Sequence, residues 1–272
     1  MKIVFAVLRV MALASALTLS LRAAPQLGLQ SWTCTAMTFE QTVEFAVRHR
    51  ITNLQFYDGH FNPKGSKEET LRKLAVLKKN GLKIYTFGVN ATSLDKEENR
   101  KLFEFAKLIG AKLIVVEPRN PAEWDNLEEL VREYDIKLAI HNHGTGTVYG
   151  DPATVRAVLA KRDRRIGVCL DVGWVTGAGF DAAEVFRSYG DRVFDIHLKD
   201  KKIEIAVDGV TVVIDTVVGT GATNFAGLFA AIKETNWSGV MAVETGRKPL
   251  TANPDTQVAA AIAVFETRTS GK

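Results

Sequence analysis

One pattern repeats eight times along the chain and restricts the fold more than any other feature. Each repeat is a short apolar run rich in β-branched residues, then a turn, then an amphipathic segment with the period of a helix. The strand-like runs are residues 26–32, 51–57, 82–88, 111–117, 136–142, 166–172, 193–199 and 239–245. The helix-like segments are residues 39–50, 67–80, 96–110, 123–135, 152–163, 181–190, 224–236 and 255–268. Apolar strands alternating with helices predict a parallel sheet covered by helices. Eight units favour a closed (β/α)8 barrel, an α/β fold, over an open doubly wound sheet.

The seventh unit carries an insertion. After the run 193–199 and Asp200 comes KKIEIAVDGVTVVIDTVVGTG, in which apolar and polar residues alternate on both sides of Asp208-Gly209. An Asp-Gly step between alternating segments is typical of a hairpin turn. The sequence therefore predicts a β-hairpin after strand seven, beside the mouth of the barrel.

Residues 1–25 are predicted to be an export signal, a signal peptide that is not part of the barrel. Lys2 opens a mostly apolar stretch that Arg9 interrupts, and small residues follow it. The uninterrupted part is about a dozen residues long, whereas a membrane-spanning helix needs about 20. Arg22 weakens the cleavage site, so an uncleaved membrane anchor is the alternative. The barrel domain is then residues 26–272, and the expected location is periplasmic or extracellular.

Charge and cysteine content narrow the class of protein further. The net charge is only +4 and the basic residues are dispersed along the helix-like segments, which gives little support to nucleic-acid binding. A small-molecule partner is expected, and a homo-oligomer stays open. Cys34 and Cys169 fall in different units, so they do not imply a disulfide framework. A single bridge between them also stays open.

Ionisable side chains stand at the carboxyl end of each of the five later strand-like runs. They are Glu117, His141 with His143, Asp171, His197 followed by Lys199 and Asp200, and Glu244. The carboxyl ends of barrel strands meet on one face, so we expect these groups to converge. Their burial is costly unless a divalent cation compensates them. Mixed carboxylates and imidazoles suit zinc, manganese, iron or cobalt better than calcium. The identity of the metal stays open, magnesium included.

Each of these residues taken alone also has an ordinary structural explanation. Glu117 precedes a proline and could be a loop carboxylate, Asp171 could cap the next segment, and His197 could be a hydrogen-bonded core histidine. Together these explanations must place an unrelated polar residue at the same end of five successive apolar strands. A shared site is therefore the stronger hypothesis.

Seven stretches make the chain similar to a known family. They are LGLQSWT, RKLFEFAKLIGAKLIVVEP, KLAIHNHG, IGVCLDVGW, DIHLKD, VVGTGATNFAGL and GVMAVET, and they extend from about Leu27 to Phe265. In this order and spacing the chain resembles the sugar phosphate isomerase/epimerase family with the xylose isomerase-like TIM barrel. Within that family it is most similar to a branch that carries the HNH sequence, here as an exported member.

The resemblance implies a divalent metal held at the ends of the later strands. Asp171, His197 and Glu244 match metal ligands of the family on strands six, seven and eight. On strands four and five the HNH branch pairs a glutamate before proline, here Glu117, with the first histidine, here His141. We take both as further ligands, although the resemblance leaves open which of Glu117, His141 and His143 bind the metal.

Two departures from the family pattern bear on the substrate. Relatives commonly show Asp-x-Gly-His after strand six, where this chain has Trp174, and often a glutamate on strand two, where it has Gln55. Both changes could signal altered substrate choice or lost catalysis. Trp174 could stack on a sugar face, with simple packing as the alternative. Trp32 and His60 are further candidates for contact with the substrate.

The implied chemistry begins with removal of a proton next to a carbonyl. A metal that binds adjacent hydroxyl and carbonyl oxygens of a sugar acidifies that proton and stabilises an enediolate. Reprotonation elsewhere then gives isomerisation or epimerisation. We assign acid–base work to His143, metal binding with proton transfer to Glu117 or Glu244, and contact with a substrate oxygen to Lys199. A solvated loop lysine is the alternative for Lys199.

Three other functions stay open from the sequence. A leaving group β to the carbonyl would make the enzyme a keto-sugar lyase or hydratase. Trp174 and Gln55 motivate a secreted carbohydrate-binding barrel that binds metal and ligand without turnover. An abasic-site endonuclease would need a histidine-rich multi-metal cluster and a basic face, which five histidines and the dispersed charge do not favour.

Overall fold

The eight predicted strands close into a barrel. The structure is a computed structural model and describes residues 24–207, 209–246 and 253–270. The barrel strands are β1 (Gln26–Gln30), β2 (Asn53–Phe56), β3 (Lys83–Asn90), β4 (Leu113–Val116), β5 (Lys137–His141), β6 (Ile166–Asp171), β7 (Val193–Leu198) and β10 (Val240–Val243). Every neighbouring pair is parallel, and β1 pairs with both β2 and β10, which closes the ring. The prediction of a closed barrel is confirmed, and the open sheet is wrong.

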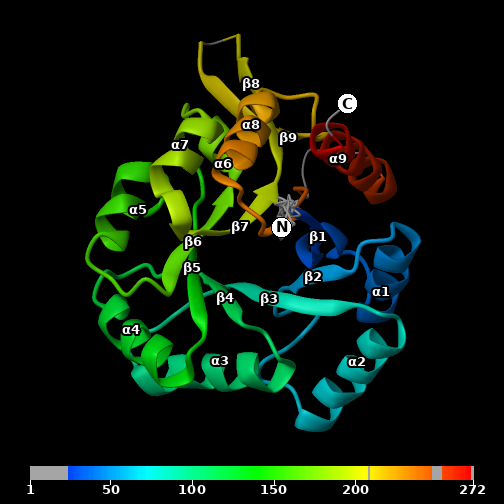
Figure 1. The fold of residues 1–272 in the computed structure, drawn as a ribbon, viewed down its shortest axis with the longest axis vertical. Coiled ribbons are helices and arrows are strands. Elements are labelled where there is room, and N and C mark those ends of the chain that lie inside the picture. The colour runs from blue at the N-terminus through cyan, green and yellow to red at the C-terminus, as the bar shows by residue number, and fades with distance from the viewer. Residues whose placement is uncertain (1–23, 208, 247–252, 271–272) are drawn as a thin grey trace, which may run out of the picture.

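Helices surround the barrel, as the ribbon in Figure 1 shows. The eight predicted helices are α1 (Phe39–Arg48), α2 (Lys67–Lys79), α3 (Lys96–Ile109), α4 (Glu123–Tyr134), α5 (Pro152–Leu159), α7 (Ala182–Tyr189), α8 (Phe225–Thr235) and α9 (Pro254–Thr269). One further helix, α6 (Val172–Gly177), was not predicted. It follows β6 without a loop, so its apolar residues extend the apolar run of the strand and hide the change of period.

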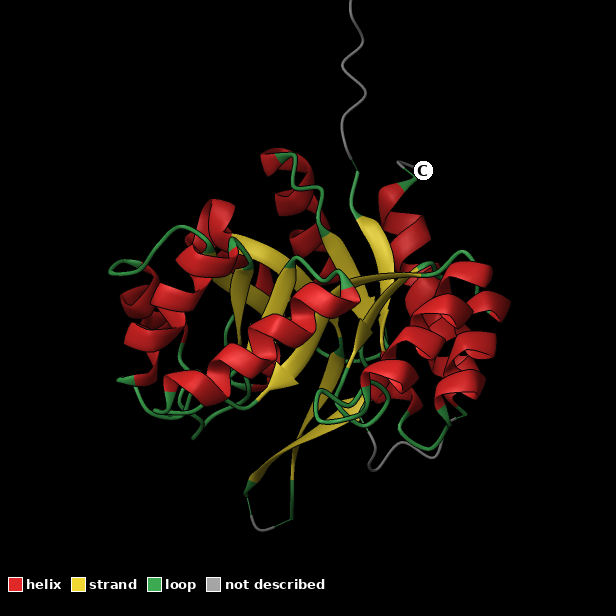
Figure 2. Ribbon diagram, turned by 90° about the horizontal axis from the view of Figure 1, so that it is seen from below, coloured by secondary structure: helices red, strands yellow, loops and turns green. Residues whose placement is uncertain are grey.

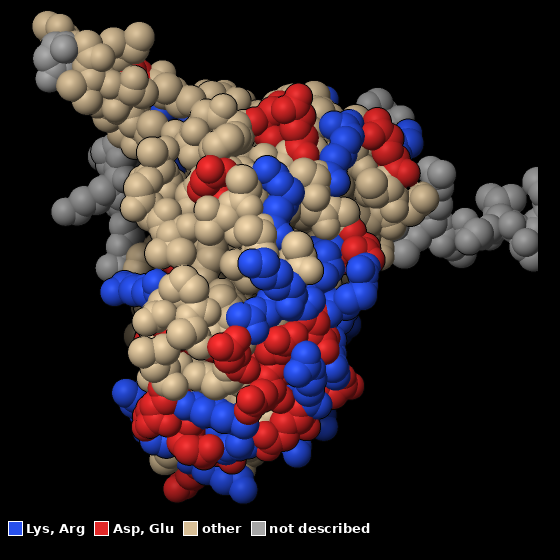
Figure 3. All heavy atoms as spheres, turned by 90° about the vertical axis from the view of Figure 1, so that its left-hand side faces the viewer, with Lys and Arg blue, Asp and Glu red and all other residues tan. Residues whose placement is uncertain are grey.

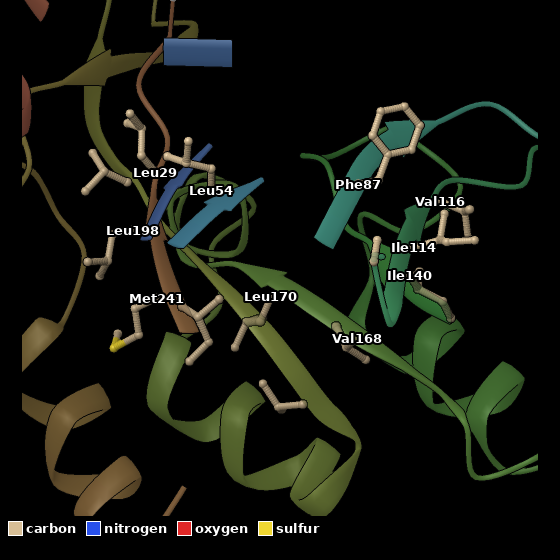
Figure 4. Close-up of a cluster of buried hydrophobic side chains, with 14 of the residues drawn as sticks. Leu29, Leu54, Phe87, Ile114, Val116, Ile140, Val168, Leu170, Leu198 and Met241 are labelled. Carbon is tan, nitrogen blue, oxygen red and sulfur yellow. The ribbon is translucent and has the colours of Figure 1, made fainter. Parts of the chain in front are cut away.

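The apolar core lies between the barrel wall and the helices. Figure 4 shows part of this layer, to which every barrel strand contributes. The labelled side chains are Leu29, Leu54, Phe87, Ile114, Val116, Ile140, Val168, Leu170, Leu198 and Met241. They belong to the same buried cluster as helix residues such as Phe45, Phe103 and Trp124. Burial of this layer is the main favourable contribution to folding.

The inside of the barrel is much more polar than this outer layer. Its separate apolar cluster is small and contains Cys169 among its buried members. Asp195 is fully buried beneath the rim and accepts hydrogen bonds from Tyr85 Oη at 3.1 Å and Cys169 Sγ at 3.4 Å. Burial raises the pKa of Asp195 to about 6. On β7 the inward-facing Asp195 and His197 thus alternate with Ile196 and Leu198 of the outer layer.

The predicted hairpin after strand seven is present. It consists of β8 (Asp200–Ile205) and β9 (Thr211–Thr216), which pair antiparallel. Figure 2 shows the hairpin projecting beyond one end of the barrel. At its root, the Asp200 carboxylate accepts hydrogen bonds from the backbone N–H groups of Gly219, Gly221 and Thr223. Asp200, expected at the site, instead anchors the loop that leads to α8.

Charges of both signs cover the outside of the helices. On the face in Figure 3, blue and red side chains are interspersed, and the projecting hairpin is mostly uncharged. Many of these charges form ion pairs, such as Arg132 with Glu128 and Arg162 with Asp125. This face therefore carries no single-sign patch.

The structure tests the possible disulfide but not the predicted signal peptide. Cys34 and Cys169 are both buried and free, so the bridge that the sequence left open is not formed. The predicted signal peptide falls almost entirely on residues 1–23, which lie outside the described residues. In the ranges that are described, no helix combines the length and the apolar character needed to cross a membrane.

Candidate metal centre

Four of the predicted ligands meet in one buried cluster. They are His141 at the end of β5, Asp171 at the end of β6, His197 on β7 and Glu244 just after β10. One ligand atom from each side chain lies within 4.8 Å of the others. None of the four residues is more than 6% exposed. The convergence of strand ends that the sequence predicted therefore occurs.

The spacing of the ligand atoms matches a small cation site. His197 Nδ1 lies 2.8 Å from Glu244 Oε2 and 3.2 Å from His141 Nε2. Asp171 Oδ2 lies 3.7 Å from His141 Nε2 and 4.0 Å from His197 Nδ1. Ligand atoms about 2.0–2.1 Å from a tetrahedral metal are separated by roughly 3.3 Å. The donor set of two imidazoles and two carboxylates suits zinc, manganese, iron or cobalt.

Asp171 combines the structural role and the functional role that the sequence left open. Its Oδ1 caps α6 by accepting a hydrogen bond of 2.9 Å from Trp174 N. Its Oδ2 is fully buried and has no hydrogen-bond partner among the described residues. A buried carboxylate oxygen without a donor is costly. A divalent cation at the cluster would satisfy it, so the residues present fit the metal that the family implies.

The asparagine between the two histidines explains the HNH spacing. Successive residues of an extended strand point to opposite sides, so His141 and His143 share a side and Asn142 faces the other. Asn142 Nδ2 donates to Asp171 O at 3.0 Å, and Asn142 Oδ1 accepts from Asp171 N at 2.9 Å. These two bonds hold the end of β5 against the end of β6. Asn142 therefore fixes the positions of both histidines relative to Asp171, a role that the sequence analysis missed.

Lys199 supplies the positive charge inside this cluster. Its Nζ donates to Glu244 Oε1 at 2.8 Å and lies 3.8 Å from Asp171 Oδ2, and the residue is buried. Burial opposes ionisation of both carboxyl groups, but the attraction of Lys199 and the neighbouring histidines together outweighs it. The pKa of Asp171 therefore lies below its usual value and that of Glu244 well below. The alternative of a solvated loop lysine is wrong, because Lys199 is enclosed.

The histidines of the cluster respond to the same charges. Burial lowers the pKa of His141, which favours the neutral imidazole that a metal needs. Burial also disfavours the charged form of His197, but the adjacent Glu244 raises its pKa above the usual value. The cluster therefore attracts positive charge at His197, and a metal ion would compete there with a proton.

Glu117 and His143 form a separate pair beside the buried cluster. His143 Nδ1 lies 2.8 Å from Glu117 Oε2, and the two side chains are 34% and 23% exposed. The His143 ring is 4.6 Å from the ring of His141, centroid to centroid. Glu117 thus lies next to the four-ligand cluster. With His141 and His143 it forms a second group that could hold a metal, so metal binding by Glu117 stays a prediction. We call Glu117 and His143 the outer pair and the four ligands the inner cluster.

A cavity of about 390 Å³ opens above both groups. Its lining includes the predicted Trp32, Trp174 and Lys199 together with the outer pair and two of the inner ligands, His141 and Glu244. It also includes residues that the sequence analysis missed, namely Tyr57, Asp58, Arg119 and Asp215. The first three follow strands β2 and β4 in loops, and their position at strand ends is the only signal that could have found them.

His60 lies elsewhere than the sequence predicted. It is 4% exposed and is not part of the cavity lining. Its Nε2 lies 3.0 Å from Met37 O and 3.4 Å from Thr42 Oγ1, so these packing contacts occupy it. His60 therefore does not reach the rim, because Tyr57 takes the place toward the cavity.

Trp174 is fixed between the hairpin root and the HNH loop. Lys201 Nζ lies 3.3 Å from the centroid of its ring and 2.6 Å from Asp215 Oδ1. A Cβ on Gly144 would lie 2.8 Å from the indole Cε3, so only glycine lets the ring pack there. The ring is packed and also lines the cavity, so its stacking on a sugar face stays a prediction.

Comparisons with known proteins agree with this fold. The family model described as xylose isomerase-like TIM barrel matches residues 39–268. An inosose dehydratase of Clostridium perfringens (strain 13 / Type A) is 29% identical over 227 residues, which are 68% of this chain and 76% of that protein. The solved IolI protein with a bound zinc atom aligns with a TM-score of 0.69 at 19% identity, covering 90% of this chain and 98% of the other. A probable 3-DHS dehydratase, AsbF of Bacillus anthracis, gives a TM-score of 0.68 at 14% identity, covering 88% and 98%. The chain belongs to the xylose isomerase-like TIM barrel family.

Proposed function

We propose that this protein is a divalent-metal-dependent lyase that eliminates water from a hydroxylated keto compound of the sugar class. The observation that carries the proposal is the outer pair beside the inner cluster, a 2.8 Å contact between His143 and Glu117 at the wall of the cavity. The similarity to an inosose dehydratase favours elimination over the isomerisation that the sequence alone suggested.

The inner cluster would hold the metal through His141, Asp171, His197 and Glu244. When bound there, a divalent cation supplies Lewis acidity that polarises a carbonyl and acidifies the adjacent C–H. The chain contributes the fixed geometry of the ligands, through the strand ends and the hydrogen bonds of Asn142. It also contributes an enclosed pocket in which electrostatic effects are stronger than in water.

The outer pair is suited to move the proton. His143 uses Nδ1 for the contact with Glu117, which leaves Nε2 for the substrate. In our proposal Nε2 removes the proton from the carbon next to the carbonyl, and the Glu117 carboxylate stabilises the imidazolium that forms. Partial exposure keeps His143 in contact with water, so the proton can leave after each turnover.

Elimination also requires an acid for the departing hydroxyl. The electron pair of the broken C–H bond forms the new C=C bond, the β C–O bond breaks, and the oxygen leaves as water once protonated. Lys199 is the candidate donor, because its ammonium lines the cavity and lies at the inner cluster. Burial opposes its charge, but the adjacent carboxylates raise its pKa, so Lys199 is protonated at neutral pH and releases its proton only to the strongly basic oxygen that forms as the C–O bond breaks. Water in the cavity then returns a proton to Lys199.

The test is proton exchange and elimination with inosose as the probe. The metal-reconstituted protein is incubated with inosose in D2O, and the carbon spectrum and mass are followed by NMR and mass spectrometry. Loss of water is the expected result. Deuterium incorporation with rearrangement but no loss of water would make the protein an isomerase or epimerase instead. Metal and ligand binding without any exchange, over a panel of keto-polyols, would overturn the enzyme proposal and leave the carbohydrate-binding barrel.

We also propose that residues 1–25 direct export, so that the substrate is met outside the cytoplasm. The support is the basic start, the short apolar stretch and the small residues that follow. N-terminal sequencing of the protein from the periplasmic or culture fraction should begin near residue 25. A full-length chain in the membrane fraction would indicate the anchor instead.

A further inference from the structure

Gln55 lies on the far side of the inner cluster from the cavity. It is on β2, is fully buried and is not part of the cavity lining. Its Oε1 lies 2.6 Å from His197 Nε2 on β7, a contact across the inside of the barrel between residues 142 positions apart. Relatives often carry a glutamate at this position. The glutamine that replaces it here therefore contacts a histidine of the inner cluster and does not line the substrate cavity.

This contact decides which nitrogen of His197 carries a proton. A neutral imidazole has one N–H and one lone pair, and the partner of one nitrogen determines the state of the other. Gln55 Oε1 can only accept a hydrogen bond, so Nε2 keeps its proton and donates it. Nδ1 is then the nitrogen that faces Glu244 and His141 in the inner cluster, where a bound metal would take the place of the proton that Nδ1 shares with Glu244.

We propose that Gln55 is a positioning residue that fixes the tautomer of His197 and so prepares Nδ1 to bind the metal. This inference rests on the metal site of the proposed function. Hydrogen-bond partners of metal-bound histidines commonly have this effect, and their loss costs about 10–100-fold in metal affinity.

A glutamine performs this task differently from a carboxylate or an apolar residue. Gln55 Nε2 has no hydrogen-bond partner among the described residues, so the contact with His197 is what holds the amide in place. The next acceptor near His197 Nε2 is Asp195 Oδ2 at 3.8 Å, too far for a hydrogen bond. A neutral amide also adds no second negative charge beside the buried Asp195. Without it, the proton could move to Nδ1 and point at Glu244.

The experiment compares three variants with the wild type. Gln55→Met removes the acceptor at similar size, Gln55→Glu keeps an acceptor, and Asn53→Leu is the matched control. Asn53 is a buried amide on the same strand that bonds Leu27 O and Gln26 and does not contact His197. Zinc affinity is measured by calorimetry with a competing chelator. Nitrogen-15 NMR of the zinc-loaded protein, and of the metal-free protein at alkaline pH, reports the state of each His197 nitrogen. The His197 signals are assigned with a His197→Asn variant.

The expected result is zinc on Nδ1 and a proton on Nε2 in the wild type. Zinc affinity should fall about 10–100-fold in Gln55→Met. It should be retained in Gln55→Glu and in Asn53→Leu. A folded Gln55→Met protein with wild-type affinity and tautomer would overturn the inference. So would zinc on Nε2 of His197 in the wild type, which needs no variant. A wild type that binds no zinc but carries a proton on His197 Nε2 would instead contradict the metal site of the proposed function.

Discussion

The inner cluster and the outer pair use the same kinds of side chain at the same rim, and they differ in depth. The side chains of the inner cluster are at most 8% exposed, whereas the His143 side chain is 34% exposed. A buried carboxylate cannot rely on water and needs a fixed positive partner. A half-exposed pair can exchange protons with solvent while its geometry is held. Depth thus separates a cation site from an acid–base site, which residue type alone does not.

The largest effect is expected from Asp171→Asn. This change keeps the shape and the cap of α6 but removes the charge at Oδ2, the buried oxygen that lacks a donor. Loss of a residue that only hydrogen-bonds to a metal ligand lowers metal affinity by up to roughly 100-fold. Loss of a ligand itself should lower it further, and turnover should vanish with it. Metal content is measured by plasma mass spectrometry after purification without chelators, with Asp58→Asn at the rim as control. Stoichiometric metal in Asp171→Asn would show that the inner cluster is not the site.

His143→Gln should separate the two regions most clearly. The variant removes the proposed base and leaves all four ligands unchanged, so metal content should stay at the wild-type level. Turnover should fall by about 10²- to 10⁴-fold, the usual contribution of a general base. The two measurements are made on the same preparation. If metal is lost together with activity, His143 belongs to the metal site and the division by depth is wrong.

Lys199→Met tests the compensation of charge within the inner cluster. Without the ammonium, Glu244 and Asp171 are buried without their cation, which costs about 3–5 kcal/mol of unfolding free energy for a broken buried pair. Chemical denaturation of the metal-free protein should show this loss. Saturating manganese should restore much of it, because a bound cation stabilises the native state and replaces the missing charge. An equal loss with and without manganese would mean that the cation does not occupy the cluster.

Much of this arrangement could be predicted from the sequence, because strand ends in a parallel barrel meet on one face. That rule placed Asp171, His197 and Glu244 together without any knowledge of their distances. It could not place Gln55 against His197, since a contact across the barrel between residues 142 positions apart leaves no local pattern. The sequence also gave no sign of how deeply each side chain is buried. Glu117 and His141 both stand at strand ends, and only the register and the loop after β4 put Glu117 in the outer pair.

Asn142 joins the two regions, and Asn142→Ala should have the smallest effect of these changes. The side chain forms two hydrogen bonds with the backbone of Asp171, a ligand of the inner cluster. Asn142 itself directly precedes His143 of the outer pair. Its loss leaves a buried N–H and a buried C=O without partners, which costs about 1–3 kcal/mol. For a domain of this size the melting temperature should fall by about 2–4 °C per kcal/mol. Because the link serves both regions, metal affinity and turnover should weaken together, in contrast to His143→Gln. A variant that melts lower but keeps both properties would show that the strand ends hold the two regions in place without this link.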